Sequence, residues 1–245
     1  MKLHQIVLIA AGIFFAAIPA SAATWIQKAA GTYEWTAPAN WLNGTLPSAT
    51  EDAALNGSSY RPSGDQTITG DGTAKALDLH NGNLGTIRTF TGNITASNLY
   101  LRVGKMNVEG NLTLTGTDQT YSIIGAAEST PNGILDILSG GTVRADGIHA
   151  LCVGRRAATD NKTASGRIWL RDGGTLVLNP SGSTDSMSGL MLGRTDGSRS
   201  VTYTASYIQE GGQATLGRFM AGFETGAYGV MSIQGGVLDL PWISD

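Results

Sequence analysis

The chain has little cysteine, and this absence limits how it can be stabilised. Cys152 is the only cysteine among 245 residues, so no internal disulfide can form and stability has to come from packing. Cys152 stands between Leu151 and Val153. If these apolar neighbours point inward, strand alternation predicts that Cys152 points outward. We expect an inert side chain there rather than a reactive thiol.

Long apolar runs are also missing after residue 22, and the one before it is typical of a leader. Lys2 is followed by an apolar stretch at residues 6–17 and by the small-x-small site Ala20, Ser21 and Ala22. A membrane anchor is the alternative, but the stretch is short for a span and no basic flank follows it. We predict that residues 1–22 are a signal peptide, that the protein is secreted or displayed at the cell surface, and that the mature chain has no membrane span.

Charge and histidine are scarce as well. Charged residues make up 14% of the chain, and removal of the leader with Lys2 leaves 15 basic and 19 acidic residues, a net charge of −4. A nucleic-acid-binding face has to be basic to neutralise phosphates, so no nucleic-acid partner is expected. His80 and His149 have no cysteine or carboxylate at metal-ligand spacing. We therefore expect no metal and no cofactor.

Glycine, in contrast, is abundant, with 34 residues. It recurs at fixed places in two short sequence phrases that alternate along the second half of the chain. The first phrase is an apolar stretch that closes on Gly-Gly, at residues 134–143, 168–178, 207–216 and 230–240. The second is an apolar step that ends at Gly125, Gly154, Gly193 or Gly222, with spacings of 29, 39 and 29 residues. Fixed phrases at variable spacing are typical of stacked repeats whose loops absorb changes in length.

Each repeat can be read as a strand, a Gly-Gly turn, a second strand, a loop and a third strand. Three short strands in about 30 residues predict one coil of a β-helix, with neighbouring coils about 4.8 Å apart. Equivalent inward side chains should then stack in rows. The expected rows are Ile137, Leu170 and Ile208, with Ile233 shifted by one; Val143, Leu176, Ala214 and Leu238; and Ala145, Leu178, Leu216 and Leu240. We predict an all-β chain with almost no helix and a β-helix over residues 66–245; the alternative is a β-sandwich, which requires antiparallel neighbours.

Residues 23–65 differ in composition from the rest. They contain three of the five tryptophans, Trp25, Trp35 and Trp41, separated by turn residues. A solenoid needs an atypical terminal unit to cover its open apolar end, so we predict an N-terminal Trp-rich cap. The alternative is a carbohydrate-binding platform made of exposed aromatic faces.

The alternating phrases resemble a known kind of repeat. LCVGRRA with GRIWLRDGGTLVL, LMLGRTDGS with ASYIQEGGQATLGRFMAG, and GAYGVMSIQGGVLDL are similar to repeats of bacterial exported β-helix proteins. These include autotransporter passenger domains and PEP-CTERM-type surface repeat proteins. The resemblance implies a right-handed parallel β-helix outside the cell and transfers no catalytic residue. Neither a barrel translocator nor a sorting helix follows, so we expect the coil to continue or to be truncated at Asp245.

Exported β-helices include polysaccharide lyases and glycoside hydrolases, so the acidic residues are candidate catalysts. A hydrolase needs two carboxylates about 5–10 Å apart. The candidate acids are Asp136, Asp172, Glu210 and Asp239. Asp172 and Glu210 each precede a Gly-Gly pair, so they would stack on adjacent coils as a candidate catalytic pair. The favoured alternative is a solvated corner, because Ser139 and Gln234 fill the same slot.

Arginines follow two of the aligned glycines. Arg155 and Arg194 should lie on adjacent coils, with Ala126 and Phe223 at the equivalent positions of the flanking coils. A two-step arginine ladder could bind an acidic glycan bidentately. The favoured alternative is that the alkyl stems cover a corner while the charges stay in water.

These observations favour a structural or adhesive β-helix that binds extracellular polysaccharide or cell-surface components without catalysis. The alternative function is a polysaccharide lyase or glycoside hydrolase that uses either Asp172 and Glu210 or the face with Arg155 and Arg194.

Overall fold

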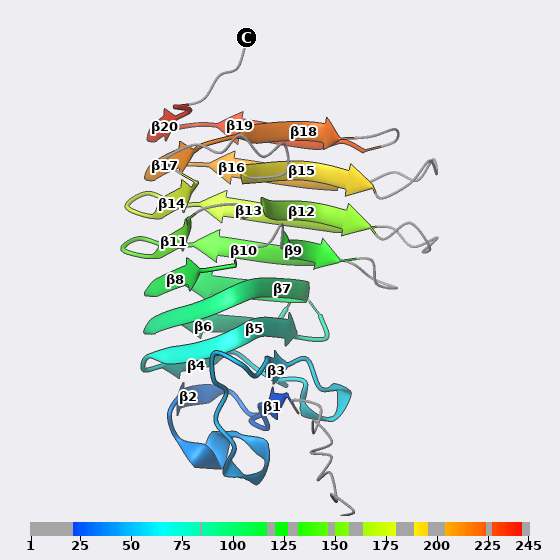
Figure 1. Ribbon diagram of the computed structural model, residues 1–245, viewed down its shortest axis with the longest axis vertical. Coiled ribbons are helices and arrows are strands. Elements are labelled where there is room, and N and C mark those ends of the chain that lie inside the picture. The colour runs from blue at the N-terminus through cyan, green and yellow to red at the C-terminus, as the bar shows by residue number, and fades with distance from the viewer. Residues whose placement is uncertain are drawn as a thin grey trace, which may run out of the picture.

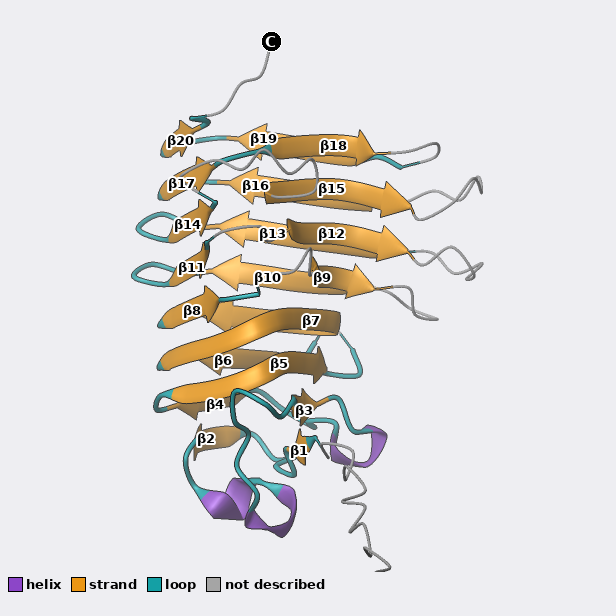
Figure 2. Ribbon diagram, in the orientation of Figure 1, coloured by secondary structure: helices purple, strands orange, loops and turns teal. Residues whose placement is uncertain are grey.

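The computed structural model of the protein describes residues 22–83, 85–116, 121–126, 132–146, 150–156, 164–179, 189–195, 204–223 and 227–241. Strands occupy most of these residues. The helical segments among them are three short 3₁₀ turns, η1 (Pro38–Asn40), η2 (Leu42–Gly44) and η3 (Ser58–Tyr60). Figure 2 shows these turns at the N-terminal end of a stack of strands. The prediction of an all-β chain with almost no helix is confirmed for these residues.

The strands form a curled parallel sheet arranged in three columns (Figure 1). The first column contains β2 (Gly31–Glu34), β4 (Gln66–Thr69), β6 (Ile87–Phe90), the end of β7 (Asn93–Val108), β10 (Asn132–Ile137), β13 (Ser165–Leu170), β16 (Thr204–Gln209) and β19 (Gly229–Ile233). The second contains the starts of β5 (Gly72–His80) and β7, then β8 (Asn111–Leu114), β11 (Thr142–Ala145), β14 (Thr175–Leu178), β17 (Gln213–Leu216) and β20 (Val237–Asp239). The third contains β1 (Ala23–Thr24), β3 (Ala53–Leu55), the remainder of β5, the middle of β7, β9 (Tyr121–Ala126), β12 (Ala150–Arg156), β15 (Gly189–Thr195) and β18 (Phe219–Phe223).

From β10 onward the chain visits the columns in a fixed order, and one strand from each column makes one rung. β10, β11 and β12 form a rung, and β13, β14 and β15 stack on it with parallel pairing in all three columns. The long strand β7 serves the three columns in turn. All pairings between the described strands are parallel, so the β-sandwich alternative, which requires antiparallel neighbours, is wrong.

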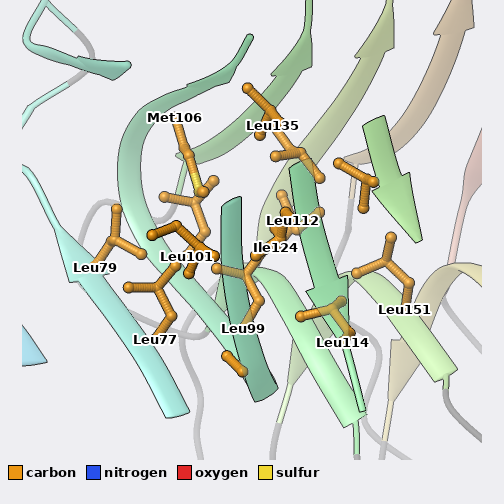
Figure 3. Close-up of a cluster of buried hydrophobic side chains, with 14 of the residues drawn as sticks. Leu77, Leu79, Leu99, Leu101, Met106, Leu112, Leu114, Ile124, Leu135 and Leu151 are labelled. Atoms are coloured by element: carbon orange, nitrogen blue, oxygen red, sulfur yellow. The ribbon is translucent and has the colours of Figure 1, made fainter. Parts of the chain in front are cut away.

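Inward side chains of the three columns meet in one apolar core. Figure 3 shows leucine, isoleucine and methionine side chains from β5, β7, β8, β9, β10 and β12 converging on this interior. The register confirms the row Val143, Leu176, Ala214 and Leu238 and the row Ala145, Leu178 and Leu216. Leu240, expected to extend the second row, lies beyond β20 and packs against the core while partly exposed. Each row buries equivalent side chains against one another, which a single rung could not do.

The third predicted row is wrong at one position. Ile137 pairs with Leu170 as expected, but Leu170 pairs with Gln209 and not with Ile208. Gln209 is fully buried, and its amide is satisfied because Nε2 donates to the Val237 carbonyl while Oε1 accepts from the Tyr207 hydroxyl. Ile233 pairs with Gln209 and so belongs to this row without a shift. Apolar character alone selected Ile208, whereas strand alternation turns it outward.

Glycines stand where the backbone turns or where two rungs approach closely. Gly125, Gly154, Gly193 and Gly222 have φ values of 75°, 65°, 71° and 65°, a region that side-chain-bearing residues rarely adopt, as predicted for these corners. Gly166 has an ordinary φ but is packed closely: a Cβ there would overlap the carbonyl oxygen of Ile124. The backbones can therefore approach this closely at Gly166 only because it has no side chain.

The three tryptophans near the N-terminus are buried beneath the first rungs. Trp25, Trp35 and Trp41 expose 0%, 2% and 1% of their surface and pack edge-to-face, with ring centroids 5.0 Å apart for Trp25–Trp41 and for Trp35–Trp41. Trp41 Nε1 donates to the Trp35 carbonyl at 2.7 Å. Trp35 also contacts Phe90 of the stack. Their ring faces are sealed in the core, so an exposed carbohydrate platform at these residues is wrong.

A buried arginine joins this segment to the stack. The Arg88 side chain is fully buried and donates to Gln66 Oε1, the Leu55 carbonyl and Asn81 Oδ1 at 3.1, 2.6 and 3.0 Å. Gln66 in turn donates to the Gln27 and Ala29 carbonyls. All of these acceptors are neutral, and burial lowers the pKa of Arg88 to about 9, which still leaves it charged at neutral pH.

Cys152 occupies a different environment from the one that alternation predicts. It lies outside the main core but is fully buried, in a small second cluster with Ala150 and Met191. Its Sγ lies 3.5 Å from Met191 Sδ, and the partly buried Tyr121 and Met220 pack against the cluster. The outward face of this column is therefore covered at Cys152, which the two-residue period could not reveal.

We expect Leu176→Asp to lower the free energy of unfolding by several kcal/mol, because it places an unpaired charge in a dry row. Val177→Asp is the matched control, since Val177 lies one residue away on the half-buried outward face, and it should cost less than about 1 kcal/mol. Urea unfolding of both variants measures the difference. Equal costs would contradict the assignment of the row.

We expect Gly166→Ala to lower the free energy of unfolding by about 1–3 kcal/mol, because the added methyl overlaps backbone. Gly85→Ala is the control: its φ is ordinary and its nearest neighbour, Asn83 Oδ1, would be 3.4 Å away. This change should be neutral or slightly stabilising. Thermal unfolding followed by circular dichroism distinguishes the two, and an unaffected Gly166→Ala variant would refute the close approach.

Candidate functional site

The predicted acid pair, Asp172 and Glu210, does not occupy equivalent positions in the two turns. Leu170 pairs with Gln209 and Thr175 with Gln213, so the turn after β16 is one residue shorter than the turn after β13. Glu210 therefore occupies the position of Arg171, and Asp172 lies beside Gly211, where a Cβ would be 2.8 Å from the Asp172 Cα. The prediction that Asp172 and Glu210 stack as equivalents is wrong, and Asp172 is exposed at its turn.

Glu210 instead belongs to an ion network that crosses four rungs. Lys105 Nζ lies 2.7 Å from Asp136 Oδ2, and Arg171 donates from Nε to Asp136 Oδ1 at 2.8 Å and from Nη2 to Oδ2 at 3.1 Å. Arg171 Nη1 donates to Glu210 Oε2 at 2.7 Å. These side chains come from β7, β10 and the turns after β13 and β16. We call Lys105, Asp136, Arg171 and Glu210 the four-rung ion network.

Trp169 lies under the centre of this network. It pairs in register with Asp136 on one side and Ile208 on the other. The Arg171 guanidinium carbon lies 3.4 Å from the centroid of the Trp169 ring, which is the distance of a stacked cation–π contact. The ring therefore fixes the plane of the guanidinium while two carboxylates hold its edges.

The electrostatics of Asp136 keep it ionised. Burial alone would raise the pKa of Asp136, but hydrogen bonds from Arg171 and Lys105, together with their charges, bring the pKa below its ordinary value. The hydrogen bond with Asp136 also raises the pKa of Arg171. A general acid needs a raised pKa, so Asp136 has the wrong protonation behaviour for that role. The network links rungs and gives no support to a carboxylate pair for hydrolysis.

The backbone places the two predicted arginines as expected. Arg155 of β12 pairs with Arg194 of β15, and the flanking partners are Ala126 and Phe223. The four side chains lie outside what the structure describes, so binding by an arginine ladder stays a prediction. His149 and residues 1–21, which belong to the predicted signal peptide, also lie outside the described residues.

Sequence reasoning named Asp136 and Glu210 but missed their partners Lys105 and Arg171. Strand register could have identified Lys105. Asp136 pairs with Asn107, and Lys105 lies two residues before Asn107 on the same outward face. Arg171 lies in the turn just after β13, which no strand pattern could place. The orientation of such a turn residue depends on the neighbouring rung.

Comparison with known proteins returned no matching family model, no matching curated protein and no matching solved structure. The resemblance to exported β-helix repeats thus stays a prediction. Within the described ranges, no helix is long and apolar enough to span a membrane. In the same ranges, no three His, Cys, Asp or Glu side chains gather as metal ligands.

We expect Asp136→Asn to lower the free energy of unfolding at pH 7 by about 2 kcal/mol, because Lys105 and Arg171 lose a charged acceptor. The contribution of a carboxylate with a lowered pKa is present above its unfolded value and disappears as pH falls through the folded pKa. The difference in free energy of unfolding between wild type and variant should therefore disappear as the pH falls below about 4. Asp146→Asn, which breaks the exposed Arg144–Asp146 pair, is the control and should cost less than about 1 kcal/mol. A gap that is independent of pH would contradict the role of Asp136.

Proposed function

We propose that the chain is an exported right-handed parallel β-helix with a structural or adhesive role at the cell surface and no catalytic activity. In this proposal residues 1–22 are a cleaved signal peptide, residues 23–65 cap the N-terminal end and residues 66–245 form the coil. The repeated visit to three columns supports a coil, and parallel crossovers in one sheet are right-handed in nearly all known cases.

The observation that carries the structural role is the four-rung ion network. A catalytic carboxylate has to be free to exchange a proton or attack a substrate. Asp136 is held on both oxygens, and Glu210 is paired with Arg171. Asp78 is likewise held by Arg102, from β7, with contacts of 2.8 and 2.9 Å. Charges that could perform chemistry are used in joining successive strands.

The proposed partners are extracellular polysaccharides or other cell-surface components. Export follows from the leader, and the mild net negative charge disfavours nucleic acid. The in-register backbone of Arg155 and Arg194 is compatible with a ladder for an acidic glycan. An adhesive solenoid presents such repeated side chains along one face.

The test uses residues 23–245, purified and incubated with a panel of acidic and neutral polysaccharides. We expect retention of the protein on at least one polysaccharide with no new reducing ends and no unsaturated products. Arg155→Ala with Arg194→Ala should weaken retention on acidic polysaccharides, whereas Arg144→Ala, at an exposed ion pair elsewhere, should not. Depolymerisation of any polysaccharide would overturn the proposal. Binding to none of the polysaccharides in the panel would also overturn it.

A further inference from the structure

A groove of about 410 Å³ lies where the N-terminal cap meets the second column. This volume falls in the range of small-molecule sites, about 300–1,000 Å³. One wall comes from the segment before β3, with Thr36, Leu46 and Pro47, and the other comes from β5 and β7 and the residue before β5. The lining residues on that second side are Asp71, Gly72, Thr73, Asn93 and Thr95.

The β5–β7 wall carries an ordered set of polar groups. Thr73 and Thr95 are register partners on neighbouring parallel strands, whose backbones lie about 4.8 Å apart, so their outward side chains are neighbours. Neither hydroxyl has a hydrogen-bond partner in the described parts of the chain. Asp71 Oδ1 accepts from the Asn93 backbone N–H at 2.9 Å and from Asn93 Nδ2 at 2.8 Å, which fixes both side chains at the rim. Two free hydroxyls therefore lie beside an oriented carboxylate and amide.

The opposite wall is mostly apolar, and the hydroxyl of its polar residue, Thr36, donates to Glu34 Oε1. Leu46 exposes 37% of its surface and lines the groove together with Pro47, while Trp35, 2% exposed, contributes only a small edge to the lining. Gly72 is required here, because a Cβ at this position would overlap Trp35 Nε1. The groove thus presents a hydrogen-bonding wall opposite a mostly apolar one.

We infer that this groove binds one or two residues of a neutral saccharide. A sugar ring matches the two walls, since its hydroxyls can exchange hydrogen bonds with Thr73, Thr95 and Asp71 while its C–H face packs on Leu46 and Pro47. Asp71 is the charged residue of the lining and disfavours an anionic ligand. A peptide added as a strand is disfavoured, because the open edge of β5 here spans residues 72–74 alone. The inference deepens the proposed function and rests on it.

The experiment titrates ¹⁵N-labelled residues 23–245 with neutral oligosaccharides of glucose, galactose or mannose, and with an oligogalacturonate. We expect amide shifts at Thr73, Asn93 and Thr95 with at least one neutral oligosaccharide. Thr73→Val with Thr95→Val keeps the shape and removes both hydroxyls, and it should weaken binding by about tenfold or more. Thr113→Val is the matched control: Thr113 continues the same row beside Thr95 but does not line the groove, so binding should stay unchanged.

The outcomes separate this inference from the proposed function. Binding of neutral oligosaccharides that the double threonine variant leaves intact would overturn the groove as the site, while the adhesive role would stand. Binding of the oligogalacturonate alone would also overturn it and would favour the arginine ladder. Thermal unfolding of all variants verifies that loss of binding is not loss of fold. Leu46→Ala tests the apolar side chains of the groove and should weaken binding while Thr73, Thr95 and Asp71 are unchanged.

Discussion

In-register parallel pairing of equivalent strands is the constraint on which the other features depend. Because each strand pairs with its equivalents in the rungs before and after it, every side chain meets the same position of the next rung. Inward positions are therefore mostly apolar in each rung, as along Val143, Leu176 and Ala214. Outward positions bring charges from successive rungs within contact distance, which is how Lys105, Asp136 and Arg171 come together. Corners repeat as well, and glycine recurs there because a side chain would collide or require a disfavoured φ.

The interior tolerates polar groups where neighbouring rungs satisfy them. Gln209 bonds to Tyr207 and Val237, and buried Ser122 accepts from the Leu99 backbone N–H at 2.8 Å. Arg88 is the most demanding case, since its acceptors are neutral and its charge has no carboxylate partner among the described residues. A buried cation is costly, so its position between the tryptophan segment and the first full rungs favours a role in holding these parts together.

The sequence predicted the structure correctly where the repeated glycine phrases align in the same way as the paired strands. The alternating glycine phrases placed the corners and two of the three apolar rows correctly, since periodicity reports which face is buried. Periodicity failed at the end of β16, because the turn that follows is one residue shorter than the turn after β13. There the polar Gln209 points inward and the apolar Ile208 points outward. A slip of one residue turns a side chain to the other face, so the same error misplaced Glu210 relative to Asp172. The saccharide groove has no sequence signature, because it combines Leu46 with Thr95, which only folding brings together.

Nuclear Overhauser contacts between the rows test the in-register parallel stack most directly. Methyl-labelled protein should show contacts from Leu176 to both Val143 and Ala214, and from Leu178 to both Ala145 and Leu216. These contacts should accompany the amide pattern of parallel strands. Two results would contradict the stacked arrangement. One is close Hα–Hα contacts between neighbouring strands, as in antiparallel pairing. The other is contacts from Leu176 to Ala145 and Leu216 in place of Val143 and Ala214.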